Sequence, residues 1–196
     1  GDPYWYEWYV GIEQIIKMLN PDNKITYIIF QSDIHNTIDD VVVGYDGIEE
    51  ICYQVKHEVG NQGKGNLTFS KIIEKTPTRS GNEKVSLIRA LALGWKEAKD
   101  LEGKSIVPIL YTNRKLGSNR TTRIFNENEY NALPLGSVLN EVLPYLKQIG
   151  TIEGLESCCD EEDLLQQWRE FKEAIGDDSI AIEFLKNLQI KANERS

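Results

Sequence analysis

DDVVVGYDGIEEICYQVKHE, residues 39–58, is the stretch that decides the fold. Two runs, 39–45 and 49–58, flank the pair Asp46-Gly47, which strongly favours a hairpin turn between two strands. Because successive strand residues point to opposite faces, Gln54 and Lys56 share one face with Cys52, whereas Tyr53 and Val55 share the other with Ile51. The stretch therefore predicts an antiparallel hairpin with a polar pair near the end of its second strand.

The rest of the chain supplies further strands and many helices. Residues 25–30 (ITYIIF) and 106–112 (IVPILYT) are rich in β-branched and aromatic residues and predict buried strands. Asp2-Pro3 is typical of a helix start, and after it a helical repeat places one set of apolar residues on a single face: Tyr9, Ile12, Ile15, Ile16 and Leu19. We expect a second helix over 86–102, with Leu87, Leu91, Trp95 and Ala98 on its inner side.

The C-terminal third is expected to be helical. The polar, basic segment 113–123 predicts a loop, and helices are expected at 137–148, 161–175 and 179–192. Residues 161–175 carry a stripe that predicts core or partner packing: Leu164, Leu165, Trp168, Phe171 and Ile175. The order indicates an α/β fold, a small mixed sheet flanked by helices with a helical C-terminal extension. We expect residues 1–125 to form the core domain and 126–196 the extension, which would lead into a further domain of a longer protein.

Composition favours a soluble cytoplasmic protein with no membrane partner. Hydrophobic residues make up 40% of the chain and charged residues 27%, which is typical of a globular protein. No apolar run approaches the roughly 20 residues that cross a bilayer. The three cysteines, Cys52, Cys158 and Cys159, are an odd number with two adjacent, so they predict reduced thiols rather than a disulfide framework or a zinc site.

The charge is unevenly distributed along the chain. The net charge is −9, but residues 56–123 hold 14 Lys or Arg against 6 Asp or Glu, a local balance of +8. The remainder has a balance of −17. Electrostatic fields act over roughly 8–10 Å in physiological salt, so a basic middle is compatible with a local phosphate-binding face.

The hairpin brings together the residue types that phosphodiester hydrolysis needs. A divalent cation is held by oxygen ligands beside the scissile phosphate, and a positive group orients water and offsets developing charge. Gln54 and Lys56 address one face, and Asp39 or Asp40 adds a carboxylate from the neighbouring strand. A two-residue turn places Asp39 opposite Gln54. A bulge or an odd-length loop places Asp40 there instead.

In the pattern Asp39-Asp40-Val41-Val42-Val43, Tyr53-Gln54-Val55-Lys56-His57 and Tyr111-Thr112-Asn113-Arg114, the chain resembles the PD-(D/E)xK nuclease superfamily. Gln54-Val55-Lys56 matches the variant with Gln at the acidic position that is familiar from Mrr-type restriction nucleases. The helix that begins with Tyr6-Glu7-Trp8 is similar to the first helix of that group. The resemblance covers roughly residues 4–125 and extends to nuclease domains fused to SAVED sensors in CBASS antiphage systems and to some STAND-type antiviral ATPases.

The resemblance implies a restriction-endonuclease-like fold and a Mg²⁺-dependent endonuclease, with Mn²⁺ as a possible substitute. This effector would cut double-stranded DNA once a companion sensor domain drives assembly into a homo-oligomer. It implies that Asp40 and Gln54 bind the metal, that Lys56 positions the attacking water, and that Glu7 contributes a further ligand. The habit of the superfamily favours Asp40 over Asp39, which stays in reserve.

The neutral amide of Gln54 in place of a carboxylate weakens cation binding, so a catalytically silent DNA-binding relative is an alternative. A second alternative is an interaction or assembly domain, which the net acidity and the helical C-terminal third favour.

Other polar residues carry weaker hypotheses. Arg114, Lys115, Arg120 and Arg123 surround Gly117-Ser118-Asn119 and form either a DNA-contacting loop or a solvated surface. His57 is expected on the opposite face from Lys56. A ligand role for His35 is not expected, Glu13 is predicted to be solvated, and Gln31 closes the first strand without a predictable direction.

Overall fold

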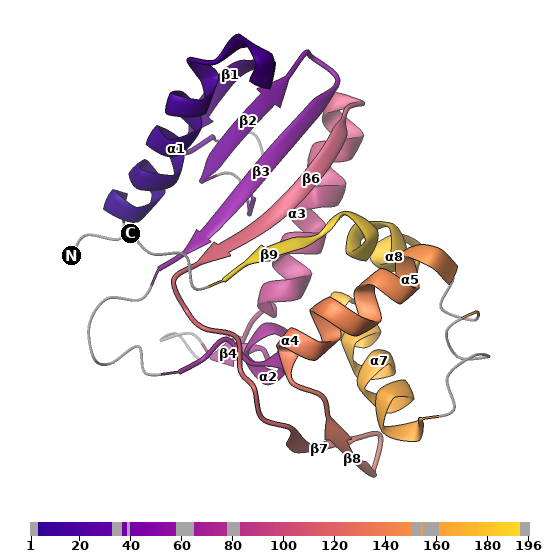
Figure 1. Cartoon of the computed structure of the whole chain (residues 1–196). Helices are drawn as coiled ribbons and strands as arrows, with labels where there is room; N and C mark the ends of the chain where they lie inside the picture. The colour runs from indigo at the N-terminus through magenta and orange to yellow at the C-terminus, as the bar shows by residue number, and fades with distance from the viewer. Residues whose placement is uncertain are drawn as a thin grey trace. The chain divides into compact units, whose positions relative to one another are not determined.

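The computed structural model describes residues 4–32, 37–38, 40–57, 65–77, 83–149, 154 and 161–192 (Figure 1). Two compact units are present. The first, here the sheet unit, comprises residues 1–65, 93–115 and 187–196, and the second, here the helical unit, comprises 66–92 and 116–186. The expected boundary after residue 125 differs from this grouping, because residues 66–92 group with the C-terminal helices and the chain end groups with the sheet.

The sheet unit is built on a mixed five-stranded sheet in the order β1-β2-β3-β6-β9. Strands β1 (Ile25–Phe30), β2 (Val41–Tyr45) and β3 (Glu49–Lys56) form an antiparallel meander, as the sequence predicts. Strands β6 (Ser105–Thr112) and β9 (Gln189–Lys191) continue the sheet parallel to β3. The prediction of an α/β fold with a mixed sheet flanked by helices is confirmed at this level.

The β2–β3 connection has one residue more than a two-residue turn. Asp46 and Gly47 have positive φ angles of 46° and 72°, and the amide of Ile48 donates to the carbonyl of Tyr45 at 3.1 Å. Tyr45 nevertheless pairs with Glu49 and Val41 with Tyr53, so Ile48 is an extra residue between turn and strand. This odd-length loop sets the register of β2 against β3. Val41 pairs with Tyr53, so Asp40, one residue before β2, lies beside Gln54.

Helix α1 (Tyr4–Met18) covers one face of the sheet. Tyr6 and Val10 of the helix join a buried cluster with alternate strand residues: Ile25, Val41, Val43, Tyr53, Val55, Ile109 and Tyr111. Burying each large side chain of this kind contributes about 1.5–3 kcal/mol. The face of α1 that the sequence singled out, from Tyr9 to Leu19, is instead exposed to solvent.

Helix α3 (Leu87–Glu102) is amphipathic, as the sequence predicts. Leu91, Trp95 and Ala98 are buried, and Leu87 is half-buried. In the sheet unit the indole Nε1 of Trp95 donates to the carbonyl of Ile106 in β6 at 2.9 Å, which ties this part of the helix to the sheet. Figure 1 places α1 and α3 on different sides of the strands.

The helical unit has several short elements and two longer helices. Its helices are α2 (Phe69–Ile73), α4 (Leu135–Ser137), the π-helical turn η2 (Val138–Val142), α5 (Leu143–Ile149), α7 (Glu162–Ile175) and α8 (Asp178–Asn187). Its strands are β4 (Thr76–Pro77) paired with β5 (Glu83–Lys84), and β7 (Thr121–Phe125) paired with β8 (Asn128–Ala132). The short 3₁₀ turn η1 (Pro21–Asn23) belongs to the sheet unit.

The stripe predicted for α7 is confirmed as core packing in its C-terminal half. Trp168, Phe171 and Ile175 are buried, and the ring of Phe171 lies 5.6 Å from that of Phe69 in α2.

Two expectations for the C-terminal third were wrong. The hairpin β7–β8 occupies residues assigned to a loop and the start of the helical extension, because Thr121–Phe125 pairs with the nearby strand Asn128–Ala132. The helix expected over 179–192 ends at Asn187, and Gln189–Lys191 pairs with Ile109–Tyr111 as β9. An apolar segment as short as residues 188–190 has no periodicity that distinguishes helix from strand.

Candidate functional site

Asp40 lies between β1 and β3 at the end of the sheet where β2 begins. The amide of Gln31 donates to its backbone carbonyl at 3.0 Å, which continues the pairing with β1. Its side-chain Oδ2 accepts the amide of Val55 at 2.6 Å and the Nε2 group of Gln54. The side-chain carboxylate thus accepts a hydrogen bond from the backbone of β3, as a strand carbonyl would. This bond holds Asp40 against β3. Asp39, the reserve candidate, lies outside the described residues.

Gln54 and Lys56 follow each other on one side of β3. Gln54 is only 7% exposed, whereas Lys56 is exposed at the strand end. The hydroxyl of Thr112 in β6 donates to the carbonyl of Lys56 at 2.7 Å and accepts the amide of Arg114 at 3.2 Å. Thr112 therefore ties the end of β3 to the segment that carries Arg114 and Lys115. Thr112 and Lys56 are 56 residues apart, so no local sequence pattern predicts this contact.

Glu7 reaches the same end of the sheet from α1. Gln31 Nε2 donates to Glu7 Oε2 at 3.1 Å, while the Gln31 backbone pairs with Asp40. Gln31 has a φ of 48°, in the left-handed region that a non-glycine residue enters rarely, and this turn of the backbone directs the chain out of β1. Gln31 is thus the link between Glu7 and Asp40.

His57 lies on the α1 face of the sheet, as strand alternation predicts. Its ring stacks on that of Tyr6 with centroids 4.2 Å apart. Burial lowers the pKa of His57, because the charged imidazolium loses hydration. Within the described part of the chain its Nδ1 has no hydrogen-bond partner. His35 lies outside the described residues, and Glu13 is paired with Lys17 at 2.9 Å on the surface of α1.

Two carboxylates offer oxygen donors at this site. The Asp40 carboxylate contacts the Gln54 amide directly, and Glu7 is connected to Asp40 through Gln31. Among the residues that the structure describes, no group of three or more His, Cys, Asp or Glu side chains is placed to hold a metal ion. Mg²⁺ commonly takes one or two carboxylates and keeps several waters. The contact between Asp40 and Gln54 therefore suits a Mg²⁺ ion that keeps most of its waters, and Glu7 is connected to Asp40 only through Gln31.

The four basic residues singled out from the sequence have different surroundings. Lys115 and Arg120 are exposed, and Arg114 is half-buried, with a pKa lowered by burial. Arg123, in the helical unit, is 14% exposed in its side chain and forms ion pairs with Glu170 at 2.7 Å and Glu74 at 2.9 Å. Its guanidinium is engaged by these two carboxylates, which favours a structural role over the DNA contact suggested by the sequence.

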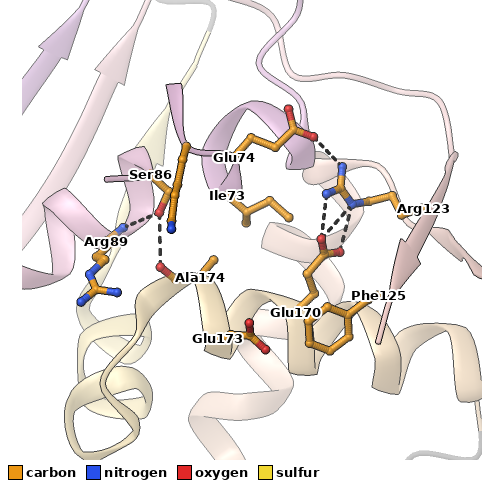
Figure 2. A pocket seen from close by; sticks show the side chains of 10 residues that line it. Ile73, Glu74, Ser86, Arg89, Arg123, Phe125, Glu170, Glu173 and Ala174 are labelled. Atoms are coloured by element: carbon orange, nitrogen blue, oxygen red, sulfur yellow. Dashed lines mark hydrogen bonds and ion pairs between the residues drawn. The ribbon is translucent and has the colours of Figure 1, made fainter. Parts of the chain in front are cut away.

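Arg123 is the centre of a second polar cluster, which Figure 2 shows beside a cavity of about 230 Å³ in the helical unit. It also donates to the hydroxyl of Ser70, and the hydroxyl of Tyr130 donates to Glu170. The hydrogen bond to Glu170 raises the pKa of Arg123, and burial and the same carboxylate raise the pKa of Tyr130. Sequence reasoning missed this cluster, because its carboxylates lie 47 and 49 residues from Arg123.

A third cluster lies at the other end of β3. The buried carboxylate of Glu50 pairs with Lys104 Nζ at 2.8 Å and accepts the hydroxyl of Tyr27. The Tyr27 ring lies over Gly44, where an added Cβ would come within 2.2 Å of the ring. We interpret this cluster as structural, because the charge of Glu50 is matched by a cation.

Comparison with known proteins adds no family assignment. A scan against protein-family models finds no match to this chain, and a search of curated proteins finds no similar sequence. Of the helices that the structure describes, none combines the length and apolar composition that a bilayer crossing requires.

Proposed function

We propose that this chain is a metal-dependent endonuclease domain of the restriction-endonuclease-like PD-(D/E)xK type that cleaves double-stranded DNA. The observation that carries the proposal is the contact of the Asp40 carboxylate with Gln54, two residues before Lys56 on β3. The meander β1-β2-β3 followed by the parallel strand β6 supports it, because this order places carboxylate, amide and lysine at one end of the sheet.

Asp40, Gln54 and Glu7 would hold Mg²⁺ or Mn²⁺. The ion would polarise the scissile phosphate and supply a nucleophilic water at neutral pH. In this structure the amide nitrogen of Gln54 faces Asp40, which is the favourable arrangement between a carboxylate and an amide alone. A half-turn of the Gln54 amide would present its oxygen beside the Asp40 carboxylate, so that both residues could serve as oxygen ligands.

Lys56 would supply a fixed positive charge beside the phosphate. Lys56 is exposed at the end of β3, and its ammonium can donate three hydrogen bonds. It would orient the attacking water and offset the negative charge that develops in the transition state. Removing a preorganised donor of this kind typically lowers the rate about 10²–10³-fold.

In the sheet unit the DNA backbone would be contacted by Arg114 and Lys115, which Thr112 ties to β3. Contacts to phosphates position a duplex without reading its sequence. By the resemblance in sequence, activity would depend on a companion sensor domain that drives homo-oligomer assembly in bacterial antiphage defence, in the cytoplasm.

The alternative of a silent, DNA-binding or assembly domain has its own support. Gln54 is neutral, and Oδ2 of Asp40 already accepts two hydrogen bonds. A site with these features binds a cation more weakly than one with two carboxylates.

Cleavage of supercoiled plasmid separates the two. We expect nicked and linear products in Mg²⁺ or Mn²⁺, with loss of cleavage in Lys56→Ala. Lys84→Ala, which removes an exposed lysine of the helical unit, is the charge-matched control and should cleave normally. Plasmid left intact by the unmodified chain in both metals would support the silent alternative, and cleavage unchanged in Lys56→Ala would refute the assigned site.

A further inference from the structure

The outer face of α1 is apolar from end to end. Nine large apolar side chains there are 38–78% exposed: Tyr4, Trp5, Trp8, Tyr9, Ile12, Ile15, Ile16, Met18 and Leu19. Trp5, Trp8, Ile12, Ile15 and Leu19 recur at intervals of three or four residues, so they form one stripe. This stripe lies opposite the buried Tyr6 and Val10. A helix that is apolar on both sides is normally buried on both sides.

Charged groups lie only beside this stripe. The charged side chains of residues 4–19 are Glu7, Glu13 and Lys17. Glu7 contacts Gln31, and Glu13 pairs with Lys17. Because these charged groups lie beside the stripe and not on it, the face can be covered without burying them.

Part of the face is held rigidly. The ring of Trp8 stacks on Phe30 of β1 at 5.0 Å, and the ring of Tyr9 stacks on Tyr6 at 6.4 Å. Strand β1 is an edge of the sheet, and Ile29 on it is partly exposed. Because ordered aromatic side chains lose little entropy on association, such a surface is suited to protein contact.

The size of the face matches one side of a protein interface. Four aromatic side chains at these exposures offer roughly 400–500 Å², and the five aliphatic ones bring the apolar total to roughly 700 Å². A standard interface takes about 800 Å² from each partner, including its polar rim.

We propose that this face of α1 binds the same face of a second copy of the chain, with the two helices antiparallel and crossing near Ile12. The N-terminal half of the stripe is aromatic and the C-terminal half aliphatic. An antiparallel crossing at Ile12 sets Trp5 against Leu19 and Trp8 against Ile16 of the other copy, so large rings meet smaller side chains. A parallel pairing would crowd the aromatic residues together. The antiparallel pair is also two-fold symmetric, the commonest symmetry of protein dimers.

The charge of the chain favours a second copy over a lipid surface. Helices that lie on membranes usually carry Lys and Arg along their polar side. Helix α1 has one lysine and two glutamates, in a chain of net charge −9, so an anionic bilayer would repel it. A neutral face, by contrast, can meet its own copy without repulsion within the contact.

Sedimentation equilibrium of the chain, in the absence of DNA and divalent metal, tests the proposal independently of nuclease activity. We expect a monomer–dimer equilibrium. Ile12→Glu brings two carboxylates together at the symmetry axis and should raise the dissociation constant about a hundredfold or more. Leu101→Glu, a change at an exposed apolar position of α3, is the matched control and should leave the dimer intact.

A mixture of Ile12→Glu and Ile12→Lys gives the decisive comparison. Each variant alone should be monomeric, and the mixture should form a heterodimer, because opposite charges then meet at the axis. Circular dichroism checks that both variants fold.

Three outcomes would overturn the proposal. They are a monomeric unmodified chain, a dimer that Ile12→Glu leaves unchanged, or sedimentation of the chain with vesicles of phosphatidylcholine and phosphatidylglycerol that Ile12→Glu abolishes.

Discussion

Asp40 in the sheet unit and Glu170 in the helical unit are both carboxylates within polar networks, but their partners differ. Asp40 accepts hydrogen bonds from two neutral groups, the amide of Val55 and the side chain of Gln54. Glu170 is matched by the guanidinium of Arg123 and by the hydroxyl of Tyr130. The guanidinium of Arg123 pairs with Glu170 as a cation from within the protein, whereas Gln54 and Val55 hold Asp40 in place as neutral donors. We therefore interpret Glu170 as part of a structural ion pair and keep Asp40 as the candidate metal ligand.

The largest effect is expected from Arg123→Ala. This change leaves Glu170, whose side chain is 12% exposed, without its cation, and we expect a loss of about 3–5 kcal/mol in the free energy of unfolding. Urea denaturation measures it. Arg120→Ala, at an exposed position of the same unit, should change stability by no more than about 0.5 kcal/mol. Equal effects of the two changes would remove the structural assignment of Arg123.

Mg²⁺ should stabilise the protein through Asp40. Ligand binding to the native state adds about 2.7 kcal/mol when the ligand is at a hundred times its dissociation constant. We expect a rise in the melting temperature with Mg²⁺ that disappears in Asp40→Asn, which keeps an acceptor for Val55 but loses the charge. The gain should persist in Arg120→Ala. A Mg²⁺ effect that survives in Asp40→Asn would place the ion elsewhere.

Gln54→Glu should sharpen the contrast by adding a second carboxylate at Asp40. Two carboxylates in contact repel each other without a cation, so we expect a loss of about 1–2 kcal/mol in metal-free protein. With Mg²⁺ bound we expect Gln54→Glu to be more stable than the unmodified chain, because the added negative charge strengthens cation binding. Calorimetric titration of both forms gives the dissociation constants, and weaker Mg²⁺ binding by Gln54→Glu would contradict the assigned ligand set.

The smallest effect concerns His57. Since burial lowers its pKa below the ordinary value of about 6.5, the unfolded state binds the proton more readily than the folded state. The stability that neutral His57 contributes is present above that value and is lost as pH falls through the lower folded pKa. Comparing His57→Phe with the unmodified chain between neutral and mildly acidic pH isolates this contribution. Identical pH profiles would show that His57 is not buried as described.

The hairpin that carries the candidate site was predictable, because strand alternation and the Asp46-Gly47 turn are local signals. The choice between Asp39 and Asp40 was not, since it depends on Ile48 as one extra residue in the connection. Arg123 was predicted either to contact DNA or to lie on a solvated surface, because the sequence around it is polar, whereas it pairs with Glu74 at the end of α2 and with Glu170 in α7. Distant pairing of this kind leaves no local pattern.

The first helix shows a different limit of sequence reasoning. Its stripe from Tyr9 to Leu19 has the spacing of a core-facing surface, yet Tyr6 and Val10 face the sheet. Helical periodicity reports that a face is apolar and not which partner covers it. When both sides of a helix are apolar, the tertiary structure is needed to tell the inner side from the outer one.

Mn²⁺ titration followed by NMR tests the central claim most directly. A paramagnetic ion broadens signals of nearby nuclei, so the side-chain amide of Gln54 and the backbone amide of Val55 should broaden first, at substoichiometric Mn²⁺. Asp40→Asn should abolish this selective broadening. The absence of early broadening at Gln54 and Val55, or broadening that Asp40→Asn leaves unchanged, would contradict the metal site at Asp40.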